Sequence, residues 1–363
     1  MQRISIHQFM ILSAAILLGT TFMPVAQATA QTAGRDAWLA VMPAYSLAIP
    51  WGYMILYLAK NHPGLTLMQI AEKLLGKWPG KGINLMYAGI TGYFAALLSS
   101  QLVDLFRRSI LPLVPTTVFA GGILLLVVIL AWSEVEVFAR FAEIVFPLIA
   151  LGLIFTTLFS IPRFEWGEFL PILENGWMPV VWGALPIVPF AMEYPLFLAG
   201  MLAFLPQGEG PRLKAGIWRA VLLVGLLDTA ITLTQTMVFG PEETKRLNYG
   251  LLALGKMIEI SKTIAGVESI FMLVWMGAST LKITGLFLGA IWGIEQVTGW
   301  KRKGWVYIGV GFLLLGIDLN KPGGAALVLE IAWVDQYLIL PLVAMGVPLL
   351  MVAEFWQRRR QRR

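Results

Sequence analysis

The sequence Ala184-Leu185-Pro186-Ile187-Val188-Pro189-Phe190-Ala191-Met192-Glu193-Tyr194-Pro195 places three prolines and a carboxylate inside an apolar run of spanning length, residues 178–205. Proline lacks the N–H that an α-helix needs, and its ring clashes with the preceding turn. A straight helix is therefore not expected. Irregular backbone at membrane depth persists only where protein or a water-filled cavity satisfies its polar groups. The stretch predicts a broken transmembrane helix whose break faces the interior of the protein.

A second break is expected in the first apolar run, residues 8–33. There Gly19-Thr20-Thr21-Phe22-Met23-Pro24 combines a proline with a glycine and two β-branched threonines, which all disfavour a continuous helix. A proline kink that serves packing alone is the alternative interpretation of each break. The two runs are the first and the sixth of the chain, and interrupted segments at corresponding positions of two halves indicate a transporter binding site.

The composition of the whole chain agrees with a membrane protein. Of its 363 residues, 58% are hydrophobic and only 13% are charged, whereas a soluble chain carries about a quarter charged residues. The absence of cysteine excludes disulfides and thiol chemistry, and His7 and His62 alone cannot build a histidine-rich metal centre. The sequence also lacks a phosphate loop and the H-E-x-x-H and G-x-S-x-G motifs. We therefore expect no enzymatic activity, no cofactor and no metal.

Ten apolar runs have the length of transmembrane helices. They cover residues 8–33, 37–59, 82–106, 114–133, 139–161, 178–205, 214–239, 264–292, 305–319 and 336–356. These runs predict an all-α polytopic membrane protein with a single transmembrane domain over residues 1–363. Its expected parts are a first five-helix repeat, a second five-helix repeat and a basic tail, at residues 1–161, 162–356 and 357–363.

The basic residues indicate the orientation of the chain. With the N-terminus inside, most of the 27 Lys and Arg residues fall on the cytoplasmic side, including the cluster from Arg358 to Arg363. The positive-inside rule therefore places both termini in the cytoplasm. The net charge of +6 is distributed over successive inner loops, so it does not indicate binding to nucleic acid. The tail is expected to lie near anionic membrane lipid.

The N-terminus allows one alternative. Arg3, the apolar residues 9–18 and Ala26-Gln27-Ala28 imitate a cleavable signal peptide. Cleavage would leave nine spans and put the basic loop at residues 60–81 at odds with the N-terminal side. We therefore expect the first span to be retained.

Glu193 is the strongest single candidate for a functional residue. A carboxylate in the middle of a span costs several kcal/mol unless it is protonated, paired or hydrated. Beside a broken helix it is expected to bind a substrate ammonium, bind a cation or carry a proton. A purely structural acid that bonds freed backbone groups is the alternative.

Two polar helix faces are also expected to face the interior of the protein. The face of the eighth run has spacings of three and four residues and consists of Glu268, Met272, Trp275, Ser279 and Lys282. The face of the seventh run consists of Asp228, Thr232, Gln235 and Thr236. Lys282 either needs a partner or cavity, or reaches the cytoplasmic interface along its flexible stem. Asp228 is one possible partner for it. The candidates for coupling or gating are Asp228, Glu268, Ser279 and Lys282.

Several short motifs, in order along the chain, resemble a known family. They are Gly34-Arg35-Asp36-Ala37-Trp38, His62-Pro63-Gly64-Leu65-Thr66-Leu67, Glu72-Lys73-Leu74-Leu75-Gly76-Lys77-Trp78-Pro79-Gly80-Lys81, Glu136-Val137-Phe138-Ala139-Arg140-Phe141-Ala142-Glu143-Ile144, Leu170-Pro171-Ile172-Leu173, Gly183-Ala184-Leu185-Pro186, Phe239-Gly240-Pro241-Glu242, and Glu268 followed by Trp275 and Lys282. Each motif alone is weakly specific. Together the chain resembles the spore germination permeases, the B subunits of GerA-type germinant receptors.

The resemblance implies a LeuT-like fold of the amino acid/polyamine/organocation type, with two inverted five-helix repeats and a ligand site between broken helices one and six. It implies a subunit in the inner membrane of the bacterial endospore that senses a germinant, often an amino acid, together with an A-type membrane subunit and a C-type lipoprotein. Gly19, Thr20 and Thr21 would offer backbone groups to the ligand carboxylate. The residues that would line the opposite side are Phe190, Met192 and Glu193.

Two positions depart from the family pattern. Met192 stands where the family commonly has glycine before the acid of the sixth helix, and Pro24 comes about two positions early. The larger Met192 side chain is expected to narrow the pocket or shift the break. An ordinary proton-coupled amino acid permease and an ion channel opened by partner subunits are the alternative functions.

Overall fold

The computed structural model describes residues 4–109, 112–257, 267–300 and 304–361, and the side chains of all of these except residues 109, 267–274 and 361. Every regular element in this part of the chain is a helix. The α-helices before residue 162 are α1 (Ile6–Leu18), α2 (Val25–Ala33), α3 (Ala37–Ser46), α4 (Ala48–Asn61), α5 (Leu67–Leu75), α6 (Lys77–Ser109), α7 (Thr116–Trp132) and α8 (Val135–Ser160).

The second half of the chain begins with a loop that contains two short 3₁₀ turns. Its α-helices are α9 (Met178–Ala184), α10 (Val188–Met201), α11 (Gly210–Thr244), α12 (Gly250–Met257), α13 (Val267–Thr298), α14 (Gly304–Leu319), α15 (Ala325–Val334) and α16 (Leu340–Gln361). A π-helical segment, η6 (Asp335–Ile339), joins α15 to α16 without a loop.

The helices confirm the predicted fold class but not the predicted count of spans. Seven helical stretches in the described residues are long and apolar enough to cross a membrane. Three further apolar helices are shorter, namely Ile6–Leu18, Thr116–Trp132 and Gly304–Leu319. Each of the ten predicted runs overlaps one of these ten helical stretches, yet length and composition together give seven spans in the described residues. The boundary between the two repeats stays a prediction.

The last span was predicted with the wrong start. The sequence pattern placed it at residues 336–356, whereas the continuous helical stretch covers Ala325–Arg360. Glu330 and Asp335 lie before the predicted run, at positions where charged residues interrupt the apolar pattern. The corrected span places Asp335 inside the helix bundle, where its side chain is only 1% exposed.

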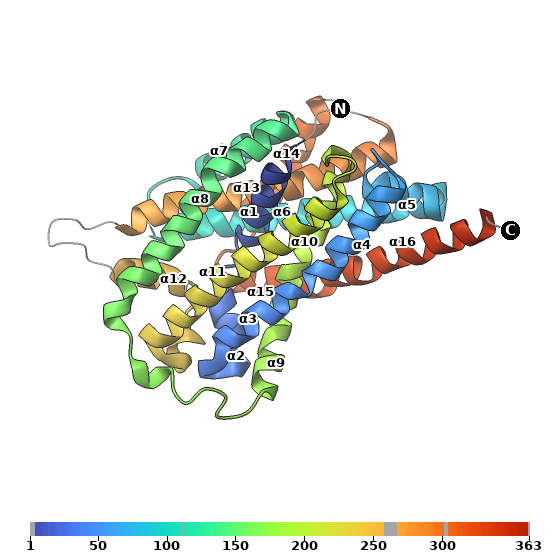
Figure 1. Cartoon of the computed structure of the whole chain (residues 1–363). Coiled ribbons are helices and arrows are strands. Elements are labelled where there is room, and N and C mark those ends of the chain that lie inside the picture. Colours follow the sequence, from blue (N-terminus) through green and yellow to red (C-terminus); the bar gives the residue numbers. More distant parts are fainter. Residues whose placement is uncertain (1–3, 110–111, 258–266, 301–303, 362–363) are drawn as a thin grey trace.

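The packing places the first span at the centre of the molecule. Helix α1 packs against α8, α10, α11 and α13, and α6 packs along α13. Figure 1 shows α2 and α9 at one end of the bundle and α5 with the end of α16 at the other, called here the α2–α9 end and the α5 end. Apolar side chains that lie exposed on the outer helices include Leu125, Ile129, Leu148, Leu151, Phe312 and Leu313. This exposure is what a lipid environment allows, since lipid tails are as apolar as leucine.

Candidate functional site

The first predicted break is present. Helix α1 ends at Leu18, residues 19–24 form turns, and α2 begins at Val25 directly after Pro24. The Thr21 hydroxyl lies 3.1 Å from the Leu17 carbonyl oxygen and 3.2 Å from that of Leu18, so it can satisfy a carbonyl at the end of α1. The break is buried, since Thr20 is 8% and Thr21 1% exposed.

The second predicted break is also present. Helix α9 ends at Ala184, a 3₁₀ turn covers Leu185–Ile187, and α10 begins at Val188. Pro189 lies in the first turn of α10, where the N–H that proline lacks would have no acceptor within the helix. The break therefore lies at the start of the predicted stretch, and Glu193 follows it in α10.

Glu193 and Lys282 form an ion pair in the interior of the protein. The Lys282 ammonium contacts Glu193 Oε2 and donates a hydrogen bond of 2.8 Å to Thr20 Oγ1. The two charged side chains are 1% and 2% exposed. Lys282 thus joins the broken first span to α10, and it does not extend to the membrane surface. Of the two interpretations of Lys282, the one with a buried partner is confirmed.

The expected pairing of Asp228 with Lys282 is wrong. Asp228 Oδ2 instead accepts a hydrogen bond of 2.6 Å from the Tyr45 hydroxyl on α3 and lies 3.1 Å from Thr21 Oγ1. The Asp228 side chain is fully buried. The break therefore has one carboxylate on each of two flanking helices, Glu193 on α10 and Asp228 on α11.

Helix α13 contacts the break through small and polar residues. Ser279 Oγ donates to the Gly19 carbonyl oxygen at 3.4 Å, and Trp275 is buried one helical turn away. The polar face predicted for this helix is therefore turned inward at Ser279 and Lys282. The side chain of Glu268 lies outside the described residues.

Two residues of the predicted ligand site have apolar surroundings. Met192 is 1% exposed and belongs to the hydrophobic core, and Phe190 is partly buried against that core. The structure brings Thr20, Glu193 and Lys282 together, joins Thr21 to Asp228, and places Ser279 against Gly19.

Asp335 is a member of the site that the sequence reading missed. It is the first residue of η6, and its carboxyl group lies close enough to Glu193 and Lys282 for their charges to act on it. The sequence contains one signal that could have identified Asp335, because an acid stands directly beside an apolar run. The predicted run starts at residue 336, so Asp335 fell just outside the predicted span.

Gly19 is required by the close approach of α1 and α13. A Cβ atom at Gly19 would lie 2.8 Å from Lys282 Cβ and 3.0 Å from the Ala278 carbonyl oxygen. We expect Gly19→Ala to lower the free energy of unfolding by about 1–3 kcal/mol, because α13 must shift. Thermal unfolding of the purified protein measures this change. The control is Gly309→Ala on α14, where a Cβ would meet nothing within 4 Å; equal losses in the two variants would contradict the close approach.

The α2–α9 end of the bundle is closed. A Cβ atom at Gly183 of α9 would lie 2.8 Å from the Ala33 Cβ on α2, so the two helices touch. Asp36 accepts the Leu173 N–H at 3.1 and 3.2 Å with its two carboxylate oxygens, and Arg35 donates to the Leu170 carbonyl oxygen. These bonds tie the loop before α9 to the end of α2.

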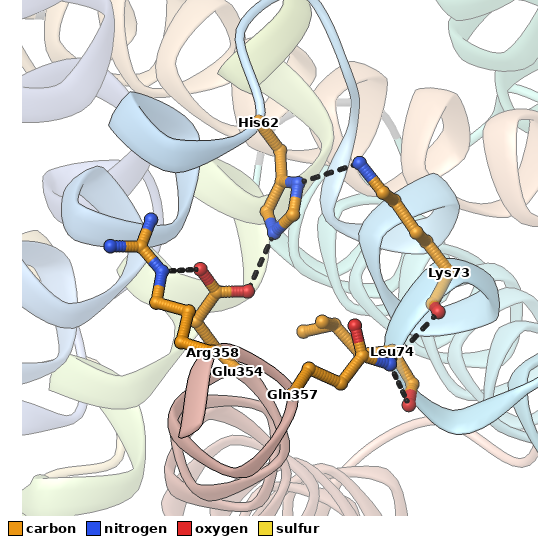
Figure 2. A network of polar contacts seen from close by, with 6 residues as sticks. All are labelled: His62, Lys73, Leu74, Glu354, Gln357 and Arg358. Carbon is orange, nitrogen blue, oxygen red and sulfur yellow. Dashed lines mark hydrogen bonds and ion pairs between the residues drawn. The ribbon is translucent and has the colours of Figure 1, made fainter. Parts of the chain in front are cut away.

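The α5 end holds a second polar cluster, the inner network of His62, Lys73, Glu354, Gln357 and Arg358 (Figure 2). His62 Nε2 lies 2.8 Å from Glu354 Oε2, and Lys73 Nζ lies 3.2 Å from His62 Nδ1. Arg358 Nε donates to Glu354 Oε1 at 2.6 Å. Gln357 Nε2 donates to the carbonyl oxygens of Lys73 and Leu74 at 3.3 and 3.0 Å. The network fastens the end of α16 to α5 and to the loop before it.

The α5 end is also hollowed. A cavity of about 550 Å³ lies between the loop before α5, the α7–α8 junction and α13, and its polar lining includes Thr66, Gln69, Glu134 and Gln296. A second cavity of about 220 Å³ shares Gly64 with it and extends toward Lys60. The α5 end is therefore hollowed, whereas at the other end α2, α9 and the loop before α9 are in contact.

Comparisons with known proteins agree on one family. The family model described as "Spore germination protein" matches residues 3–320. The spore germination protein YndE of Bacillus subtilis (strain 168) is 25% identical over 283 residues, which are 76% of this chain and 75% of that protein. Spore germination protein KB of the same organism is 21% identical over 366 residues, covering 99% of this chain and 96% of that protein.

The fold matches a solved transporter structure. The crystal structure of MhsT in complex with L-phenylalanine superposes with a TM-score of 0.71 at 14% sequence identity, over 95% of this chain and 88% of that one. This similarity confirms the LeuT-like fold that the family resemblance implied. The match of the family model over most of the chain gives the conclusion that this protein belongs to the spore germination protein family, within the class of permeases with a transporter fold.

Proposed function

We propose that the protein is a subunit of a spore germinant receptor that binds a small germinant, an amino acid, between the broken first span and α10. The observation that carries the proposal is the buried charge at the break: Lys282 bonds Thr20 and pairs with Glu193, and Asp228 accepts from Thr21. Buried charges in a membrane protein are costly and mark ligand or ion pathways.

The ligand orientation follows from the two charges that an amino acid carries. Its carboxylate is placed at the N-terminus of α2, because the helix dipole favours an anion there. Its ammonium is placed beside Glu193, where it competes with Lys282 for the carboxylate. Binding therefore rearranges an internal ion pair, and this rearrangement is a means of signalling to partners.

The experiment is a thermal-shift screen of the purified full-length chain against the pooled twenty L-amino acids and then against each one. An amino acid that raises the unfolding midpoint identifies the ligand, since binding to the native state stabilises it. Glu193→Gln is expected to weaken that binding roughly tenfold to a hundredfold, because it removes one charge-assisted hydrogen bond. The control is Glu136→Gln, in an exposed pair with Arg140. Unchanged affinity in Glu193→Gln would reject the site.

A proton-coupled amino acid permease is the second candidate, because the chain has a transporter fold with buried carboxyl groups. Uptake of labelled amino acid into proteoliposomes separates the two functions. Accumulation driven by a pH gradient in the isolated chain favours the permease. Saturable binding without uptake favours the receptor, whose proposed setting is the inner endospore membrane, with cytoplasmic termini and with an A-type subunit and a C-type lipoprotein as partners.

A further inference from the structure

We propose that Glu193 and Asp335 form a carboxyl pair that holds one shared proton in the empty site, and that the ammonium group of an amino acid displaces this proton. The claim that a ligand displaces the proton, the ligand half of the inference, rests on the proposed function. The claim that the two carboxyl groups share a proton, the proton half, does not. The pair lies between α10 and η6, two segments that pack directly against each other.

The first support is an unmet need for a hydrogen-bond donor. Asp335 is 1% exposed, and no donor among the described residues bonds either of its carboxyl oxygens. Glu193 Oε2 has the Lys282 ammonium as its donor. Two ionised carboxylates only accept, so Asp335 and Glu193 cannot bond each other in that state. A proton shared by the two groups gives Asp335 a hydrogen bond to Glu193.

The second support is the balance of charge. The charged groups that act on Asp335 within the described residues are Glu193 and Lys282. Asp228 adds a further carboxyl group near Lys282, with Tyr45 as its neutral hydrogen-bond donor. If all three acids were ionised, one ammonium would face three negative charges. Two carboxylates that share a buried site do not both ionise readily, and one of them keeps its proton.

The third support is the backbone at Asp335. A π-helical segment interrupts the last span at this residue, and such segments are frequent at functional sites because the extra residue redirects a side chain. Here the Asp335 side chain approaches Glu193. When an amino acid binds, its ammonium brings a second positive charge to the pair. The two carboxylates then accept from Lys282 and the ligand ammonium, and the displaced proton is released to water.

Infrared spectroscopy of the full-length protein in detergent tests the proton half without a ligand. The wild-type spectrum is expected to contain a C=O stretching band of a buried protonated carboxyl group. Asp335→Asn and Glu193→Gln are each expected to lose this band, because either change leaves only one carboxyl group of the pair and no second carboxylate to share a proton with. The control Asp104→Asn, in an ion pair with Arg108, keeps it. A wild-type spectrum without the band overturns the proposal even if the variants do not fold, and so does a band that survives Asp335→Asn.

The ligand half is tested by adding the pooled twenty L-amino acids to the same wild-type sample. Loss of the band supports displacement of the proton. A band that persists at concentrations that produce a thermal shift overturns it. If the pool gives no thermal shift at all, the proposed function fails instead, and the proton band still decides whether the carboxyl pair exists.

Discussion

Replacing Lys282 with methionine is expected to lower the thermal unfolding midpoint by roughly 4–7 °C. Removal of one partner of a buried ion pair costs about 3–5 kcal/mol, because the other charge stays buried and unpaired. For a chain of this length that loss corresponds to a shift of this order. Methionine keeps most of the volume of the lysine stem, so the effect reports the charge and not a cavity. Thermal unfolding in detergent gives the measurement.

A double variant makes this prediction specific to the pair. Lys282→Met combined with Glu193→Gln is expected to be more stable than Lys282→Met alone, since no ionised Glu193 is left without its ammonium. The control is Lys321→Met. Lys321 pairs with Glu330, and both side chains are partly exposed, so its loss is expected to cost less than about 1 kcal/mol. A double variant less stable than either single variant would show that the ammonium does not compensate Glu193.

The broken first span was predictable because its causes are local. A glycine, two threonines and a proline within six residues disfavour a helix whatever surrounds them, and the structure has turns at that place. The inward face of α13 was predictable for a similar reason. Helical periodicity alone puts Ser279 and Lys282 on one side, and a buried break on that side then needs their polar groups.

Which residues pair with each other in the site was harder to predict from the sequence. Lys282 pairs with Glu193 and not with Asp228, although all three are buried acids or bases in neighbouring spans. That choice depends on how α10, α11 and α13 are rotated against each other, which periodicity within one helix does not determine. Asp335 was missed for a different reason. An acid at the edge of an apolar run is typical of the end of a membrane segment, whereas Asp335 lies within the helical stretch Ala325–Arg360.

The contacts of the inner network could also not be predicted from the sequence, because its members are separated by long stretches of chain. His62 and Glu354 are 292 positions apart, yet their side chains are 2.8 Å apart and almost fully buried. The sequence predicts no partner for His62, and it predicts a basic tail at residues 357–363. The structure shows that this end contacts α5 and the loop before it, so the last helix is anchored and not merely attached to lipid.

The second large effect is expected from Glu354→Ala. This change removes the acceptor that holds His62 and Arg358, and it leaves the buried His62 ring without that partner. Loss of the charged acceptor of a buried hydrogen bond costs about 1.5–3 kcal/mol, and the exposed part of the Arg358 contact adds little. Because the network joins the end of α16 to the loop before α5, the loss is expected to be local. Hydrogen–deuterium exchange is expected to rise at residues 350–361 and 62–66.

The pattern of exchange distinguishes a fastening role from a general loss of stability. If Glu354 holds α16 against α5, exchange rises in these two segments while the amides of α1 and α13 stay protected, since the Glu193–Lys282 pair does not contact the network. Glu136→Ala is the matched control, because Glu136 forms an exposed ion pair four residues from Arg140 and its removal is expected to change exchange little. Uniform faster exchange throughout the bundle would contradict the fastening role. Protection of residues 350–361 as strong as in the wild type would show that apolar packing alone holds α16 in place.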